Sequence, residues 1–136
     1  MKIKPVILCG GEGTRLWSNT KRNQAKQFIN FGGWNLFEKT LERIKQKNFD
    51  DPIISTNLKY LRQIQYFLKK AKIKRYDIIL EPLKKNTAAA ILTAALIKNV
   101  PYNQGLLFLP ADHFIKDNNR LNDSIDKNIK NLNNKN

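Results

Sequence analysis

The sequence is short of the residues that would hold a fold together covalently or around a metal ion. Among its 136 residues there is one cysteine, Cys9, and one histidine, His113. A single cysteine excludes a disulfide bond within the chain, and its place in an apolar segment is typical of a small buried filler. A lone imidazole has no second ligand of its kind here, so we interpret His113 as structural.

Long apolar runs are also missing. The charged start Met1–Lys4 leads into an apolar run of only a few residues. Such a run is too short for a membrane span or for a secretory signal peptide. We therefore expect a cytoplasmic protein that has no membrane partner.

Acidic residues are scarce. The chain has 11 of them against 25 lysines and arginines, which gives a formal net charge of +14. An excess of this size is typical of proteins that bind nucleic acid. The lysines, however, are spread along the chain together with 17 asparagines, which indicates a general bias toward Lys, Asn and Ile. A basic surface would also attract nucleotides and sugar phosphates, so nucleic acid is the least favoured partner.

What the chain does contain is enough apolar sequence for one core, since 41% of its residues are hydrophobic. Length and composition agree with a single domain, and strand-like and helix-like segments alternate as an α/β fold requires. We expect strands near residues 3–8, 52–55, 76–80 and 105–109, and helices near residues 35–47, 58–70 and 87–98. Residues 28–31, which two glycines follow, predict a short hairpin arm.

A glycine-rich segment follows the first expected strand and carries the strongest functional signal. Gly10, Gly11 and Gly13 let the backbone approach a ligand with no Cβ in the way, so successive N–H groups can point at anionic oxygens. Arg15 adds a planar, permanently charged group suited to phosphate. The dinucleotide fingerprint would need glycine at Leu16, and a Walker loop is absent. The alternative is a plain glycine-rich turn.

A second expected strand, near residues 76–80, also ends in polar groups. Glu81 closes that strand, and Asn86 or Thr87 is placed to cap the helix that follows. The apolar residues of that helix recur at i, i+3, i+4, i+7 and i+8 and make one face apolar: Ala88, Ile91, Leu92, Ala95 and Leu96. Capped helix starts attract anions and polar ligands.

A third expected strand, Leu106–Leu109, is followed by Asp112. A carboxylate directly after a buried strand must be solvated, paired or bound to a metal ion. In an open parallel sheet the ligand crevice lies outside the carboxyl ends of the strands. If the expected strands are parallel, Gly11, Glu81 and Asp112 gather at one edge of the sheet.

In order and spacing, these segments resemble the amino-terminal half of the nucleotidyltransferase domain of mannose-1-phosphate guanylyltransferases, also called GDP-mannose pyrophosphorylases. The matching segments are Leu8–Trp17, Ala25–Phe28, Glu81–Pro82, Asn86–Ala88 and Leu109–His113. The first alone would indicate only the wider superfamily of sugar-nucleotide pyrophosphorylases, whereas Trp17, Lys-Gln-Phe and Asn-Thr-Ala narrow the resemblance to the mannose branch. The resemblance implies an α/β fold of the Rossmann-like three-layer α/β/α nucleotidyltransferase (nucleotide-diphospho-sugar transferase) type.

The resemblance also implies a reaction, in which GMP is transferred from GTP to mannose 1-phosphate, giving GDP-mannose and pyrophosphate with the help of Mg²⁺. Arg15 and Lys26 would be catalytic through contacts with the phosphates, and Asp112 would ligate Mg²⁺. The residues that would bind the nucleotide are Gly10, Gly11, Gly13, Thr14, Glu81, Asn86 and Thr87.

The sequence departs from the family pattern in two loops and in length. Ala25 stands where the family usually has proline, which leaves the loop that carries Lys26 less rigid, and Ser18–Arg22 replaces Pro-Leu-Ser-Arg. The family's catalytic domain also continues well beyond 136 residues and there supplies the sugar-phosphate site and a second carboxylate. We therefore expect residues 1–117 to be the amino-terminal half of a truncated or split domain, and residues 118–136 to be an Asn- and Lys-rich helix or frayed tail.

Three interpretations of function stay open. The first is a guanylyltransferase domain that needs a complementary carboxy-terminal chain, or a second copy, to complete it. The second is an inactive remnant or split subunit that binds GTP and Mg²⁺, and the third is a basic nucleic-acid-binding protein. An unpaired sheet edge and an uncovered apolar face would make the isolated chain marginally stable or self-associating.

Overall fold

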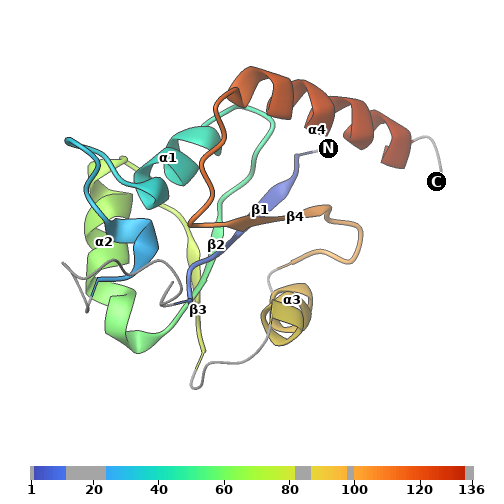
Figure 1. Cartoon of the computed structure of the whole chain (residues 1–136). Helices are drawn as coiled ribbons and strands as arrows, with labels where there is room; N and C mark the ends of the chain where they lie inside the picture. Colours follow the sequence, from blue (N-terminus) through green and yellow to red (C-terminus); the bar gives the residue numbers. More distant parts are fainter. Residues whose placement is uncertain (1, 12–23, 82–86, 98–99, 134–136) are drawn as a thin grey trace.

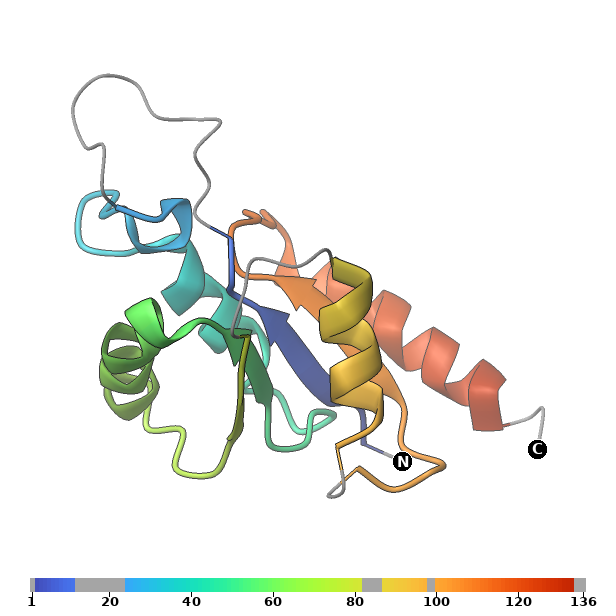
Figure 2. The ribbon, with the colours of Figure 1, turned by 90° about the horizontal axis from the view of Figure 1, so that it is seen from below.

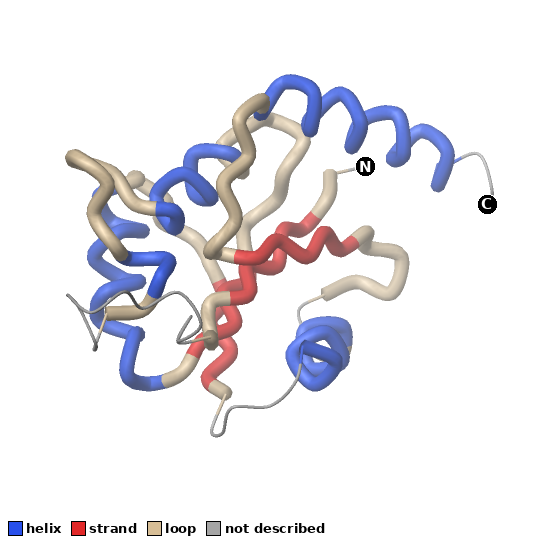
Figure 3. The backbone as a smooth tube through the Cα atoms, in the orientation of Figure 1, coloured by secondary structure: helices blue, strands red, loops and turns tan. Residues whose placement is uncertain are grey.

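The computed structural model describes residues 2–11, 24–81, 87–97 and 100–133. Its centre is a sheet of four strands in the order β3-β2-β1-β4 (Figure 1). The strands are β1 (Lys4–Leu8), β2 (Ile53–Thr56), β3 (Asp77–Leu80) and β4 (Leu106–Pro110). Every pairing is parallel, so the carboxyl ends of these strands lie at one edge of the sheet, as the sequence predicts. Figure 3 shows the strands together in the middle of the fold, with helices around them.

The two central strands, β1 and β2, form because apolar residues on both of their faces are covered. Val6 pairs with Ile53 and Ile7 with Ile54, and none of the four side chains is exposed. Continuous apolar runs are typical of parallel strands that are buried on both faces. Successive side chains point to opposite faces, so Val6 and Ile53 face one helical layer while Ile7 and Ile54 face the other.

Helices cover the two faces unequally and give three layers. One face is covered by α1 (Leu36–Arg43), α2 (Leu61–Lys70) and α4 (Asn118–Asn133), which share one apolar core. The other face is covered by α3 (Thr87–Ala95), alone among the helices that the structure describes (Figure 2). The expected α/β/α architecture is confirmed. Within the described residues, no helix is long and apolar enough to cross a membrane.

α1 begins at a reciprocal cap. The Asn35 Oδ1 atom accepts a hydrogen bond from the Glu38 backbone N–H at 2.8 Å, and the Asn35 N–H donates to Glu38 Oε2 at 3.2 Å. The helix ends at Arg43, before the expected end near residue 47, because the chain turns there to bury Phe49. The helix expected from residue 58 starts as a short 3₁₀ turn, η3 (Leu58–Tyr60), and continues as α2.

α4 is attached to the rest of the fold by polar contacts as well as by apolar ones. Arg43 is 2% exposed, and its Nε donates to Asn118 Oδ1 at 3.1 Å at the first residue of α4. Further along the helix, Asn48 Nδ2 donates to Asp126 Oδ1, and Ile129 is buried in the core. Residues 118–133 therefore form a packed helix despite their many asparagines.

α3 does not pack against the sheet through the apolar face that its periodicity predicts. The side chains that meet the sheet are those of Ala90 and Ala94. The three large side chains on the predicted apolar face are exposed instead: Ile91 is 39% exposed, Leu92 61% and Leu96 73%. Small alanines allow the helix axis to lie close to the sheet, and the large side chains are left on the outer surface.

Two further expectations were wrong. β4 is not a buried strand, because it pairs with β1 alone among the described strands and only Leu109 of its residues is buried. The expected hairpin arm is a 3₁₀ turn, η2 (Lys26–Phe28), and then a tight turn at Gly32 and Gly33, both of which have positive φ. Phe28 is the last residue of η2, and its side chain is buried in the core, 3% exposed.

Candidate functional site

The carboxyl edge of the sheet brings the ends of all four strands together. The strand pairing continues for one more residue at each of three ends: the Cys9 N–H donates to the Ser55 carbonyl at 2.7 Å, the Ala111 N–H to Leu8 at 3.0 Å, and the Glu81 N–H to Thr56 at 2.7 Å. β2 lies beside β1 and β3 lies beside β2, whereas β4 lies on the other side of β1. The order therefore reverses between β1 and β4, which is where open α/β sheets bind ligands.

Lys26 and Asp112 meet at that point. The Lys26 Nζ atom lies 3.7 Å from Asp112 Oδ2, and the two side chains are 26% and 39% exposed. His113 Nε2 lies 3.8 Å from the other carboxylate oxygen. A half-exposed pair at this separation contributes little to stability, so both groups can exchange each other for a ligand at small cost.

Lys26 is held in place by its neighbours on η2. The ring of Phe28 is buried among Phe37, Tyr60 and Phe67, with ring centroids 5.5 to 6.0 Å away. Gln27 is 3% exposed, and its Nε2 donates to the Gly11 carbonyl at 3.1 Å. Gln27 thus joins the turn that carries Lys26 to the glycine segment after β1. The Lys-Gln-Phe motif in the sequence does not by itself indicate this role for Gln27.

Cys9 follows β1, and its buried thiol is poorly suited to act as a nucleophile. Burial raises the pKa of its thiol to about 12, a hydrogen bond with Gln27 lowers the pKa, and the charge of Asp112 raises it. A thiol with this pKa stays protonated at neutral pH and is a poor nucleophile. The prediction of a small buried filler is confirmed by its 1% exposure.

Glu81 occupies the other end of the edge, next to the glycine segment. Its Oε1 accepts a hydrogen bond from Ser55 Oγ at 2.5 Å. A Cβ atom on Gly10 would lie 3.2 and 3.3 Å from the two carboxylate oxygens, whereas a Cβ on Gly11 would meet nothing within 4 Å. Gly10 therefore makes room for a side chain of this protein, and Gly11 is the glycine with open space beside it. Ser55 was absent from the sequence-based site, since a serine inside an apolar strand carries no signal.

The structure thus brings together Lys26 with Asp112, and Gly10 with Glu81. Thr87 is the exposed first residue of α3. The other predicted site residues, Gly13, Thr14, Arg15 and Asn86, lie outside the described residues.

At the reversal point of the sheet, the described residues offer a magnesium ion the carboxylate of Asp112. In the part of the chain that the structure describes, no three side chains of His, Cys, Asp or Glu cluster as a metal site. Asp112 is a partly exposed carboxylate at the reversal point of the sheet. Mg²⁺ is commonly held by one or two carboxylates together with substrate phosphates, so Asp112 fits a site of that kind.

The family of the chain follows from its similarity to known proteins. The family model described as "Nucleotidyl transferase" matches residues 4–135. The chain belongs to the nucleotidyl transferase family. Within that family it is related to mannose-1-phosphate guanylyltransferases. It is 40% identical over 116 residues to the mannose-1-phosphate guanylyltransferase of Salmonella montevideo, and 39% identical over 119 residues to the alginate biosynthesis protein AlgA of Pseudomonas fluorescens.

The match covers only part of the length of the nucleotidyl transferase relatives. The two alignments cover 85% and 86% of the chain but 24% and 25% of the relatives, so the chain spans about a quarter of their length. Among solved structures, it matches the mannose-6-phosphate isomerase from Helicobacter pylori with a TM-score of 0.72 and 30% identity, covering 96% of this chain and 46% of that one. A putative glucose-1-phosphate thymidylyltransferase from Bacillus anthracis shares the fold at a TM-score of 0.70 and 19% identity, with 93% and 50% of the chains covered.

Proposed function

We propose that this chain is the amino-terminal part of a mannose-1-phosphate guanylyltransferase, which transfers GMP from GTP to mannose 1-phosphate and releases pyrophosphate. The observation that carries the proposal is the Lys26–Asp112 pair at the reversal point of the sheet, in a chain about 40% identical to enzymes of that name. The distribution of charge at the carboxyl edge supports it: a cation and a carboxylate face each other at one end, and a second carboxylate stands at the other.

In this reaction the protein must align two anionic substrates and neutralise negative charge on their phosphates. It needs no protein nucleophile. An oxygen of the sugar phosphate forms a bond to the α-phosphorus of GTP as the bond from that phosphorus to pyrophosphate breaks. Mg²⁺, when bound, supplies charge neutralisation at the phosphates. The protonated thiol of Cys9 agrees with a direct displacement, since it offers no covalent intermediate.

Each group at the edge has a role in this proposal. Lys26 donates hydrogen bonds to phosphate oxygens, and its 3.7 Å separation from Asp112 leaves those donors available. Asp112 holds Mg²⁺, and Glu81 with Thr87 binds the nucleoside. Backbone N–H groups from Gly11 onward cradle the phosphates, together with Gly13 and Thr14, and Arg15 stabilises the leaving pyrophosphate. Asn86 shares with Thr87 the role of binding the nucleoside.

The sugar-phosphate site and a further carboxylate for Mg²⁺ are proposed to come from residues that correspond to the rest of the relatives' length. They would be supplied by a complementary carboxy-terminal chain or by a second copy. A second candidate function is that of a subunit that binds GTP and Mg²⁺ without transferring GMP. The observation that favours it is that the described residues contain no group of three or more His, Cys, Asp or Glu side chains that could hold a metal ion.

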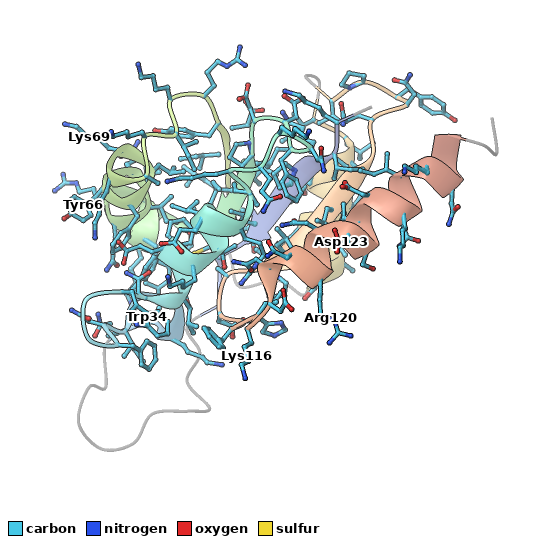
Figure 4. The ribbon with its side chains drawn as sticks, turned by 90° about the horizontal axis from the view of Figure 1, so that it is seen from above. Trp34, Tyr66, Lys69, Lys116, Arg120 and Asp123 are labelled. Atoms are coloured by element: carbon cyan, nitrogen blue, oxygen red, sulfur yellow. The ribbon has the colours of Figure 1, made fainter. Side chains whose placement is uncertain are left out.

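The test is pyrophosphate release from the folded chain with Mg²⁺, GTP and mannose 1-phosphate, compared with the D112N variant. Asp123 provides a matched control, because it is an exposed carboxylate on α4 (Figure 4) with no ion pair among the described residues. Release that needs all three components, disappears in D112N and persists in D123N supports transferase activity. GTP binding that depends on Mg²⁺ and Asp112 without release favours the binding subunit. Binding of neither nucleotide nor sugar phosphate, together with salt-sensitive binding of random DNA, would overturn both.

A further inference from the structure

The amino edge of the sheet, at the opposite end of the strands from the candidate functional site, carries a hollow of about 340 Å³. It is lined by residue 2 ahead of β1, residues 44–52 between α1 and β2, and residues 72–75 between α2 and β3. Part of this lining is buried and apolar, since Ile44 and Phe49 are each 6% exposed. Pockets that hold small molecules commonly enclose about 300–1,000 Å³. The hollow is therefore large enough for one.

The exposed lining of this hollow carries an excess of positive charge. Its cations are Lys2, Lys45, Lys72, Lys74 and Arg75. Its carboxylates are those of Asp50 and Asp51, and Asp51 Oδ2 lies 3.0 Å from Arg75 Nε in an ion pair. Asp50 Oδ1 accepts a hydrogen bond from the Asp51 N–H at 2.9 Å. Within the described residues, none of the four lysines forms an ion pair. The hollow thus offers ammonium groups that have no protein counter-ion.

Lysines near the end of a helix often serve only to complement its dipole and to cap its last carbonyls. At the end of α2 those carbonyls already have backbone partners. The Lys72 N–H donates to the Lys69 carbonyl at 2.9 Å, and the next N–H, of Ile73, donates to Leu68 at 3.0 Å. Lys69 itself lies on the last turn of α2 (Figure 4) and complements the dipole there. Lys72 and Lys74, which follow the helix, are therefore not needed as its caps.

Lys72 also occupies a backbone position that favours glycine. Its φ is 59°, in the left-handed region, and it follows α2 directly after the C-cap Ala71, where glycine is the usual residue. A residue with a Cβ atom is strained in this region. Among the described residues, Lys72 is the single non-glycine residue with positive φ. The charge at residue 72 is thus present although the backbone there favours a residue without a side chain.

We propose that this hollow is a second anion site, which binds a small molecule that carries two or more phosphate groups. Flexible lysines donate hydrogen bonds to phosphate oxygens, and the apolar lining accommodates the uncharged part of the ligand. Cations that converge from three segments suit a compact polyanion, whereas an extended nucleic acid needs a row of cations along its backbone.

The site is separate from the carboxyl edge of the sheet. β1 spans five residues, about 15 Å, between the two edges, so the ligand does not touch the Lys26–Asp112 pair. The inference does not depend on the proposed function.

The probe is inorganic pyrophosphate, and calorimetry measures its Kd for the folded chain in the presence of EDTA. The chelator removes any metal-dependent binding at Asp112. The decisive variant is K72G, which removes an ammonium group and at the same time relieves the backbone. We expect K72G to weaken pyrophosphate binding about tenfold, while its melting temperature stays at or above that of the wild type. K74A should weaken binding by a similar factor.

K130A and K26A are the matched controls. Lys130 is an exposed lysine on α4 that forms no ion pair among the described residues, and Lys26 is the cation of the carboxyl edge. Both variants should bind pyrophosphate as the wild type does.

Several outcomes would overturn the inference. One is a wild type that binds no pyrophosphate, and another is a K72G variant that binds it as tightly as the wild type. An equal loss in K72G and K130A would assign the effect to net charge alone. A loss confined to K26A would place the pyrophosphate at the carboxyl edge. A K72G variant that binds single-stranded DNA more weakly and pyrophosphate unchanged would make the hollow part of a nucleic-acid surface instead.

Discussion

Trp34 and Phe114 hold their rings 5.9 Å apart and thereby join two loops at the carboxyl edge of the sheet. Trp34 follows η2, which carries Lys26, and Phe114 stands two residues after Asp112. Phe31 lies on the other side of Trp34, at 5.2 Å between ring centroids. Figure 4 shows Trp34 beside the segment that leads through Lys116 into α4. The aromatic cluster thus links the two halves of the Lys26–Asp112 pair.

Replacing Trp34 with alanine should loosen the segment that carries Asp112. An aromatic pair contributes about 0.5–1.5 kcal/mol, so local opening of residues 111–117 should become roughly two to twelve times more frequent. Amide hydrogen exchange of that segment measures the change. Y66A is the control, because Tyr66 is a 62% exposed ring on α2 that contacts Phe67 away from this loop. Equal exchange in W34A and the wild type would show that the cluster does not stabilise the loop.

Cys9 should make the protein less stable in alkali. Its pKa is raised from the ordinary 9.0 to about 12 in the fold, chiefly by burial. Above pH 9.0 the unfolded thiol loses its proton while the folded one keeps it, so the free energy of unfolding falls as pH rises. The fall due to Cys9 is about 1.4 kcal/mol per pH unit and ends near the folded pKa. Urea unfolding of the wild type and of C9A, below and above pH 9.0, isolates this slope, and parallel slopes would contradict it.

Three of the strand ends could be predicted from the sequence, because in each an apolar run stops before a glycine or a carboxylate. Gly10, Glu81 and Asp112 all follow such runs, and a parallel sheet places them at one edge. The Ser55–Glu81 contact could not be predicted, because it depends on which strands are neighbours and on their register. β3 lies next to β2 with Ser55 opposite Ile79, and this pairing brings the Ser55 hydroxyl within reach of Glu81.

The orientation of α3 also could not be predicted from the sequence. Its periodicity shows that Ile91, Leu92 and Leu96 share a face, and this much is correct. Periodicity alone does not say which of two apolar faces meets the sheet when alanines line the other. Ala90 and Ala94 permit the closer approach, and the large residues are left exposed.

Substitution by alanine should have different effects at Gly10 and Gly11, the two glycines after β1. G10A places a Cβ 3.2 Å from the Glu81 carboxylate and should cost about 1 kcal/mol of stability, because the Glu81 side chain must shift to relieve the tight contact. G11A meets nothing within 4 Å, so its stability should stay within about 0.5 kcal/mol of the wild type. If the Gly11 backbone approaches phosphate, G11A should nevertheless weaken GTP binding. Thermal unfolding and GTP titration of the two variants separate these effects, and a destabilised G11A would contradict the assignment.

The outer face of α3 should drive self-association of the isolated chain. Leu92 and Leu96 are 61% and 73% exposed, and the neighbouring strand β4 has one side unpaired among the described strands. Exposed apolar patches and open strand edges favour association with another chain. We expect the sedimentation coefficient of the wild type to rise with concentration, and the double variant L92E/L96E to sediment as a monomer with unchanged stability.

The variant A94E is the control for the predicted self-association. Ala94 has no exposed surface and lies against the sheet, so a glutamate there should destabilise the fold by about 3 kcal/mol or more. A wild type that stays monomeric at every concentration would show that this face needs no partner. A double variant that still associates would place the contact elsewhere, most simply on the open edge of β4, where a charged substitution at the exposed side of the strand is the next test. Because that edge and the outer face of α3 lie on adjoining elements, the two tests together decide whether one partner covers both.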